Sequence, residues 1–339
     1  MSTTHPQPPP PSTPGLSPSE LSFFHENGYL VIPNYLTPTE VSNLLSTTNT
    51  LLNDFPLSTH PLTRFTTGDE DLTAKHVGDE YFLTSANKIH FFFEPDAFNP
   101  DTDPPTLKKP KHFSINKIGH ALHALSPPFA AITTPNPKEQ GVGTRTAAIA
   151  RDLSFRDPRV LQSMVICKQP QIGAAVRPHI DSEFLYTDPP SAVGWWIALQ
   201  DAGSGNGGLG VWKGSHKRGY VRRRFVRCQG GEGGTEFVGW AGKGRGLARE
   251  LEEGGDREKY VPRDEDFVQL DVPAGGLVLI HGNLLHQSER NTSEKSRFAY
   301  TFHVIEGAEG WVYDERNWLQ PEEKGVGAKG FTSLFGGGN

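Results

Sequence analysis

The sequence predicts a mainly β protein with flanking helices, built as a double-stranded β-helix, that is, a jelly-roll or cupin-like barrel. Short runs of β-branched and aromatic residues follow one another between residues 160 and 306, separated by glycine- and proline-rich turns. Helix signals gather before residue 160. In addition, His179 and Asp181 stand two apart on one predicted strand, so both side chains point to the same face.

The chain divides into one domain and two tails. Residues 1–16 are proline-rich and predict a disordered tail, and residues 320–339 are glycine-rich and predict a flexible one. Residues 17–319 form a single predicted domain, with helices and a hairpin in 17–159 and the barrel core in 160–306. Residues 222–262, rich in glycine, arginine and glutamate, predict a mobile insertion over one barrel mouth.

Two capping boxes mark the first helices. Ser17 with Glu20 opens a helix that Gly28 ends, and Thr37 with Glu40 opens a second that reaches about residue 53. Further helices are expected at 116–125 and 144–153, and hairpin strands at 81–83 and 89–93.

The expected helix 116–125 carries His120 and His123 one turn apart, a spacing that can bind metal. No third ligand lies near in sequence, so packing or surface exposure is the favoured interpretation.

The barrel strands are predicted from hydrophobic runs. They lie at residues 160–168, 194–199, 267–272, 276–280, 284–288 and 297–305. The last two are expected to pair with each other across residues 289–296.

Composition excludes several classes of function. A net charge of −6, with both signs spread along the chain, indicates neither a nucleic-acid nor a membrane partner. The two cysteines, Cys167 and Cys228, predict free thiols, and no run of about 18 apolar residues is present. With no secretory or peroxisomal signal, we expect a cytoplasmic protein that acts on a small molecule.

His179 and Asp181 supply two-thirds of a facial triad, the ligand set that holds iron(II) and leaves three adjacent sites open. The preferred third ligand is His286, with His281 and His303 as rivals. His286 is preferred because Ser288 and Arg297 fall at suitable positions after it. An arginine deep in a barrel suits the far carboxylate of 2-oxoglutarate, because its guanidinium binds bidentately and stays charged. Ser288 adds a hydroxyl donor.

Several segments resemble the phytanoyl-CoA dioxygenase family, most closely its phytanoyl-CoA dioxygenase domain-containing branch. The resemblance spans about residues 21–318. The segments that carry it are Ser163-Met164 and residues 116–120, 178–187, 214–216, 281–288 and 296–303.

The resemblance implies iron ligands at His179, Asp181 and His286, and a salt bridge from Arg297 to 2-oxoglutarate. It also suggests that Lys117, Met164, Trp196 and Ser288 line the co-substrate pocket. Trp195 is the rival of Trp196, since adjacent strand residues face opposite ways. Core packing for Met164 and a solvated charge for Lys117 remain the alternatives.

These observations favour a dioxygenase that uses Fe(II), 2-oxoglutarate and O2 to hydroxylate a small organic or acyl substrate. Asp181 favours hydroxylation over halogenation, which needs a vacant ligand position. A zinc hydrolase would leave Arg297 and Ser288 unexplained. The alternative is a non-catalytic, cupin-like protein that binds metal and 2-oxoglutarate.

Overall fold

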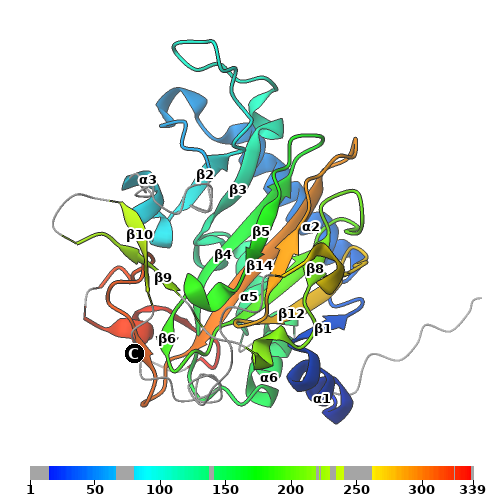
Figure 1. Ribbon diagram of the computed structural model, residues 1–339, viewed down its shortest axis with the longest axis vertical. Coiled ribbons are helices and arrows are strands. Elements are labelled where there is room, and N and C mark those ends of the chain that lie inside the picture. The colour runs from blue at the N-terminus through cyan, green and yellow to red at the C-terminus, as the bar shows by residue number, and fades with distance from the viewer. Residues whose placement is uncertain are drawn as a thin grey trace, which may run out of the picture.

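The structure is a computed structural model that describes residues 15–65, 80–136, 141–218, 221, 223–229, 234–239, 262–323 and 325–336. Its larger sheet contains β1 (Tyr29–Ile32), β2 (Ile89–Phe93), β3 (Ile115–His120), β4 (Pro158–Lys168), β7 (Val193–Ala198), β12 (Leu277–His281), β14 (Arg297–Glu306) and β16 (Thr332–Ser333). The order is β1–β12–β7–β14–β4–β3–β2, with β16 also paired to β4 (Figure 1).

A smaller sheet lies against the larger one. It contains β5 (Val176–His179), β8 (Leu209–Val211), β11 (Val268–Gln269) and β13 (His286–Ser288), in the order β11–β8–β13–β5. Two further pairs join β9 (Arg223–Arg227) to β10 (Thr235–Gly239), and β6 (Thr187–Asp188) to β15 (Val312–Tyr313). All of these pairings are antiparallel, which agrees with the predicted jelly-roll barrel.

Successive side chains of a strand point to opposite faces of the larger sheet, so each face packs against a different layer. Trp195 and Ile197 of β7 belong to a core cluster that also contains residues of the helices. Trp196 of β7 and Ile280 of β12 face the other way and pack with Val211 of the smaller sheet. Helices therefore cover one face of the larger sheet, and the smaller sheet faces the other (Figure 1).

The helices are α1 (Pro18–Asn27), α2 (Pro38–Asp54), α3 (Glu80–Leu83), α4 (Leu122–Leu125), α5 (Pro127–Thr133) and α6 (Val142–Asp152). Short 3-10 helices are η1 (Leu57–Thr59), η2 (Ser85–Asn87), η3 (Lys111–Phe113), η4 (Asp181–Glu183), η5 (Ser215–Lys217), η6 (Asp264–Asp266) and η7 (Gly327–Gly330). Both predicted capping boxes are confirmed, because Ser17 and Thr37 accept from the backbone N–H of Glu20 and Glu40. No helix in the described ranges combines the length and apolar character needed to cross a membrane.

The helix expected at residues 116–125 is wrong. Residues up to His120 form β3, which pairs with both β2 and β4, and only α4 at the end is helical. The apolar spacing of Ile115, Ile118 and Leu122 imitates a helix, but pairing on both sides satisfies the backbone as a strand. The strand expected at 81–83 is likewise wrong, since α3 lies there.

The pairing expected between 284–288 and 297–305 is also wrong. β13 pairs with β5 and β8, whereas β14 pairs with β4 and β7. The intervening loop therefore passes from the smaller to the larger sheet instead of turning a hairpin.

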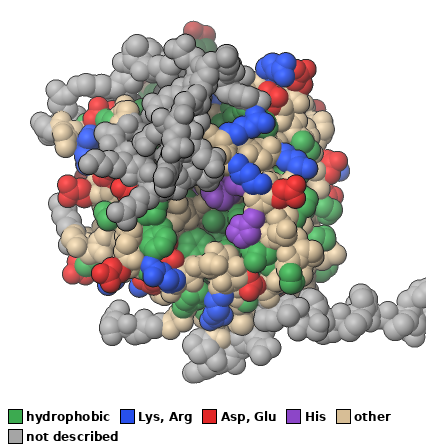
Figure 2. Space-filling model, turned by 60° about the horizontal axis from the view of Figure 1, so that its bottom comes forward, with side chains coloured by type: hydrophobic (Ala, Val, Ile, Leu, Met, Phe, Trp, Pro, Cys, Tyr) green, Lys and Arg blue, Asp and Glu red, His purple; other side chains and the backbone are tan. Residues whose placement is uncertain are grey.

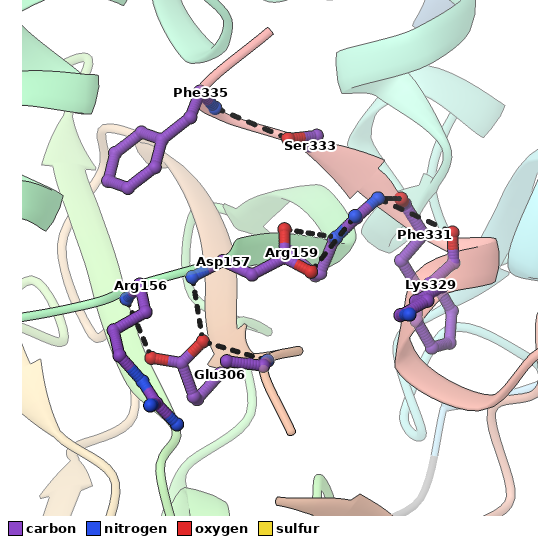
Figure 3. A network of polar contacts seen from close by, with 9 residues as sticks. Arg156, Asp157, Arg159, Glu306, Lys329, Phe331, Ser333 and Phe335 are labelled. Carbon is purple, nitrogen blue, oxygen red and sulfur yellow. Dashed lines mark hydrogen bonds and ion pairs between the residues drawn. The ribbon is translucent and has the colours of Figure 1, made fainter. Parts of the chain in front are cut away.

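Residues 325–336, within the segment expected to be a flexible tail, pack against the larger sheet. Arg159 of β4 donates to the carbonyl oxygen of Phe331 at 3.2 Å, and the backbone N–H of Leu334 donates to that of Pro158 at 3.0 Å. Glu306 accepts from the backbone N–H of Asp157 at 2.8 Å on the same side of the barrel (Figure 3). Within the expected insertion 222–262, β9 and β10 form a hairpin; residues 240–261 and the tail 1–14 lie outside the described residues.

Candidate active site

The two sheets bring the first ligand candidates together. His179 ends β5 and His286 begins β13, and these two residues are direct partners in the antiparallel pair. Asp181 starts η4, whose turn is closed by the backbone N–H of Phe184 donating to the Asp181 carbonyl oxygen at 2.9 Å. The chain thus turns back immediately after β5 and leaves the carboxylate beside both imidazoles.

The geometry of this trio fits a metal ion. Nε2 of His179 and Nε2 of His286 each lie 3.7 Å from Oδ1 of Asp181. The three candidate ligand atoms lie within 4.8 Å of one another. The separations are too long for good hydrogen bonds, but they suit atoms that share a cation.

Backbone carbonyls set the orientation of both imidazoles. Nδ1 of His179 lies 2.9 Å from the Arg177 carbonyl oxygen, and Nδ1 of His286 lies 3.0 Å from that of Leu284. Each Nδ1 must carry the proton to donate to its carbonyl, so each Nε2 keeps its lone pair toward Asp181.

The charge states also suit a metal. Burial, with His286 nearby, lowers the pKa of His179 to about 4, so this imidazole is neutral at pH 7. Burial alone would raise the pKa of Asp181, but His286, His303 and His179 outweigh it and hold that pKa below its usual value. Neutral imidazoles and an ionised carboxylate are the forms that bind metal.

The two rival histidines have other roles in the structure. Nε2 of His303 lies 3.2 Å from the second oxygen of Asp181, Oδ2, on the side away from the trio's shared oxygen. Its Nδ1 lies 3.4 Å from Nε2 of Gln162. His281 accepts from the backbone N–H of Asn283 at 3.0 Å and lies outside the trio.

One cavity contains the trio and all the residues that the sequence assigned to the co-substrate pocket. These are Lys117, Met164, Trp196, Ser288 and Arg297, and they line it together with His303. Trp196, not its rival Trp195, faces this space; Trp195 is fully buried and stacks on Phe302 on the other side of the sheet. Figure 2 shows a hollow on one face of the molecule where histidine and hydrophobic side chains gather.

Arg297 is a buried cation with unused donors. Its side chain lies over the Trp196 ring at 5.3 Å, and Nη2 donates to the Gly207 carbonyl oxygen at 2.6 Å. Among the described residues, Nε and Nη1 have no hydrogen-bond partner. Burial lowers the pKa of Arg297 to about 10, so it remains charged at pH 7. A carboxylate on the Nη1 side of the guanidinium would give that donor a charged partner.

Lys117 adds a second cation to the cavity. It is buried, its Nζ lies 3.3 Å from the centre of the Phe65 ring, and burial lowers its pKa to about 7. The alternative of a solvated helix charge is wrong, because Lys117 belongs to β3 and points into the cavity.

Sequence reasoning missed Phe82, Phe184, Phe225 and Trp318, four of the aromatic residues that line the same cavity. They come from α3, the turn after the H-x-D motif, β9 and the segment after β15. Only Phe184, three residues after Asp181, had a sequence signal.

Among the residues that the structure describes, His120 and His123 have no third metal ligand beside them. Nδ1 of His120 lies 2.7 Å from the Ser85 hydroxyl, and Nδ1 of His123 lies 2.8 Å from the Ser163 hydroxyl. Burial lowers the pKa of both imidazoles, so they are neutral packing residues.

Comparisons with known proteins agree with this barrel and site. The family model described as "Phytanoyl-CoA dioxygenase (PhyH)" matches residues 24–299, and the chain belongs to this family of iron- and 2-oxoglutarate-dependent oxygenases. It is 41% identical over 308 residues to a phytanoyl-CoA dioxygenase of Arabidopsis thaliana, covering 91% of this chain and 95% of the relative. It is 40% identical to the phytanoyl-CoA dioxygenase domain-containing protein 1 of Bos taurus, covering 90% and 95%.

Solved structures share the fold at low identity. The apoform of EctD from S. alaskensis superposes with a TM-score of 0.55 at 18% identity, covering 96% of this chain and 89% of that one. The epimerase SnoN in complex with Fe3+, alpha ketoglutarate and nogalamycin RO gives a TM-score of 0.53 at 15% identity, covering 93% of both chains.

Proposed function

We propose that this protein is an Fe(II)- and 2-oxoglutarate-dependent dioxygenase that hydroxylates a small organic or acyl substrate. Decarboxylation of 2-oxoglutarate to succinate and CO2 would be coupled to that hydroxylation. One observation carries the proposal: a His–Asp–His trio whose candidate ligand atoms lie within 4.8 Å of one another shares a cavity with a buried arginine, and Nε and Nη1 of that arginine are unpartnered among the described residues.

Each site residue has a proposed role. His179, Asp181 and His286 hold the iron. Arg297 and Ser288 bind the far carboxylate of 2-oxoglutarate. The remaining three proposed co-substrate contacts, which line the same space, are Lys117, Met164 and Trp196.

Iron, with 2-oxoglutarate and O2, supplies the oxidising chemistry. The protein's own residues prepare the site for it. The carbonyls of Arg177 and Leu284 fix the two imidazoles, which removes the need to reorganise them on binding. Arg297 carries a full charge on a side chain that is almost fully buried, where attraction to a carboxylate is stronger than in water.

The compartment is proposed to be the cytoplasm. Cys167 and Cys228 are both free thiols, as a reducing compartment favours.

The first test measures succinate formed from 2-oxoglutarate by anaerobically iron-loaded protein after O2 is admitted. Asp181→Ala and Arg297→Ala run beside the wild type, with Arg290→Ala as a matched control, since Arg290 is exposed and pairs with Asp96. We expect turnover in the wild type and the control and its loss in the other two. A wild type that binds neither iron nor 2-oxoglutarate would show the proposal to be wrong.

A further inference from the structure

Strand β14 runs along the cavity, so positions on this strand locate its two ends. Arg297, Thr301 and His303 are separated by even numbers of residues along this strand, so their side chains share one face. All three line the cavity. Ile305, next on that face, belongs to a hydrophobic cluster beyond the metal ligands. His303 contacts Asp181, so the proposed iron site lies between the Arg297 end and the Ile305 end.

The Arg297 end is positively charged. Arg297 pairs with Lys168 of β4, and Lys117 of β3 pairs with Ile166, two residues along β4. Two of the three cationic side chains that line the cavity, Arg297 and Lys117, therefore lie on the same side of the metal ligands. This end suits an anion, as proposed above for 2-oxoglutarate.

Among the residues that the structure describes, aromatic and other uncharged side chains line the opposite end. Phe82 stacks on Trp318 with ring centres 4.4 Å apart, and Phe184 lies 5.5 Å from Phe225. Phe184 also meets the imidazole of His179 edge-on at 5.9 Å, so this wall adjoins a proposed metal ligand.

A neutral imidazole, that of His120, lines the cavity beside this wall. His120 lies 5.2 Å from Trp318 and 5.9 Å from Phe82, ring centre to ring centre. Burial holds the pKa of His120 well below its ordinary value, and the Ser85 hydroxyl lies 2.7 Å from its Nδ1. A charged ligand group would find no ionic partner among the aromatic residues of this wall.

The wall is held together before any substrate binds. Arg227 of β9 donates through Nε to the Trp318 carbonyl oxygen at 2.8 Å and through Nη2 to that of Leu83 at 3.0 Å. These bonds tie the hairpin that carries Phe225 to the segments that carry Trp318 and Phe82. The aromatic surface is thus preorganised, which lowers the entropic cost of binding.

We propose that the surface formed by Phe82, Phe184, Phe225 and Trp318 binds the reacting part of the substrate, and that this part is an uncharged hydrocarbon chain or ring. The inference rests on the proposed function and adds the substrate class to it. A charged group there would lose its hydration without gaining a partner, whereas an apolar group gains from leaving water. Any charged group of the substrate lies outside this wall.

The test uses iron-loaded protein with 2-oxoglutarate under anaerobic conditions, and two neutral apolar probes, 2-naphthol and 1-octanol. Lysine and glucose serve as hydrophilic probes. Binding is read from the melting temperature and from probe titration, and oxygen is then admitted to measure succinate. We expect both apolar probes to raise the melting temperature and to increase succinate formation, and both hydrophilic probes to do neither.

Variants localise the binding. Phe225→Ala should weaken binding of the apolar probes about tenfold, and Trp318→Leu by a similar factor. Phe237→Ala is the matched control: Phe237 lies on the same hairpin, 5.0 Å from Phe225, but does not line the cavity, so probe affinity should stay within about twofold. Phe225→Leu, a milder change, guards against misfolding and should fall between the wild type and Phe225→Ala.

Two outcomes would overturn the inference. Either the apolar probes bind wild type and both cavity variants equally, or lysine and glucose act as well as the apolar probes. Failure of the proposed function looks different. In that case Asp181→Ala and Arg297→Ala leave succinate formation unchanged, whatever the probes do at the aromatic wall.

Discussion

Arg297→Met should stabilise the ligand-free protein while abolishing binding of 2-oxoglutarate. Arg297 is 1% exposed, and burial lowers its pKa from 12.5 to about 10. At about 1.4 kcal/mol per pKa unit, holding the charge in the folded state costs roughly 3 kcal/mol at pH 7. A neutral methionine avoids that cost.

Part of this gain is offset. The variant loses the hydrogen bond from Nη2 to the Gly207 carbonyl oxygen and the contact with the Trp196 ring. Each contributes about 1 kcal/mol. The expected net effect is a gain of about 1 kcal/mol in the free energy of unfolding of the metal-free, 2-oxoglutarate-free protein.

The assay is urea unfolding at pH 7, with and without 2-oxoglutarate and a redox-inert divalent metal. Ligand at about 100 times its dissociation constant stabilises the wild type by about 2.7 kcal/mol and the variant not at all, so the order of stability reverses. Arg290→Met, at an exposed ion pair, should change stability by less than about 0.5 kcal/mol in both conditions. If Arg297→Met is less stable than wild type by more than about 1 kcal/mol without ligand, the guanidinium is adequately paired and the reasoning fails.

Three further predictions concern neighbouring residues. His303→Leu should weaken Co(II) affinity about 10- to 100-fold in an absorption titration, because Asp181 loses its partner at Oδ2. His303→Gln should keep most of the Co(II) affinity, and equal affinities in the two variants would contradict this reasoning. The lowered pKa of Lys117, about 7, means that between about pH 7 and 10.5 the unfolded chain binds a proton that the folded one does not. Stability of the metal-free protein should therefore rise with pH by up to about 1.4 kcal/mol per unit across this window, and urea unfolding at pH 7 and 9 should show a smaller rise for Lys117→Met. Ser215→Ala should cost about 1–2 kcal/mol in the same assay, since the Ser215 hydroxyl accepts from the backbone N–H of Leu285 at 2.9 Å; an unchanged midpoint would count against that bond.

The sequence placed His179 and Asp181 of the candidate metal site together because a local rule relates them. His179 and Asp181 stand two apart in an extended segment, and the period of a strand is enough to put both on one face. The caps at Ser17 and Thr37 are equally local, which explains why the first two helices begin where expected.

Pairing between distant segments was harder to predict. Residues 116–120 have an apolar spacing close to that of a helix, and only the neighbouring β2 and β4 make them a strand. The same reason explains the error at 284–305, where each strand found partners in a different sheet. A local sequence pattern does not indicate which sheet edge the rest of the chain leaves available for pairing.

The aromatic wall was beyond sequence reasoning for a related reason. Phe82, Phe225 and Trp318 come from three segments that lie far apart in the sequence. None of these residues belongs to a recognisable motif. What joins them is Arg227, whose partners are backbone carbonyls that any residue would provide. Because Arg227 binds backbone carbonyls, no particular side chain in the sequence indicates its partners. This part of the site can therefore be identified only from the folded structure.

The separation of charge within the cavity explains why a barrel of this kind needs its ligands. Arg297 and Lys117 lie on one side of the proposed iron site, and burial lowers the pKa of both. An unoccupied cation pair is costly, and a dianionic co-substrate removes the cost at the place where it must be held for turnover. The aromatic side carries no such cost, so it can stay assembled without ligand. 2-Oxoglutarate bound at the cationic end should therefore stabilise the protein far more than any apolar molecule bound at the aromatic wall.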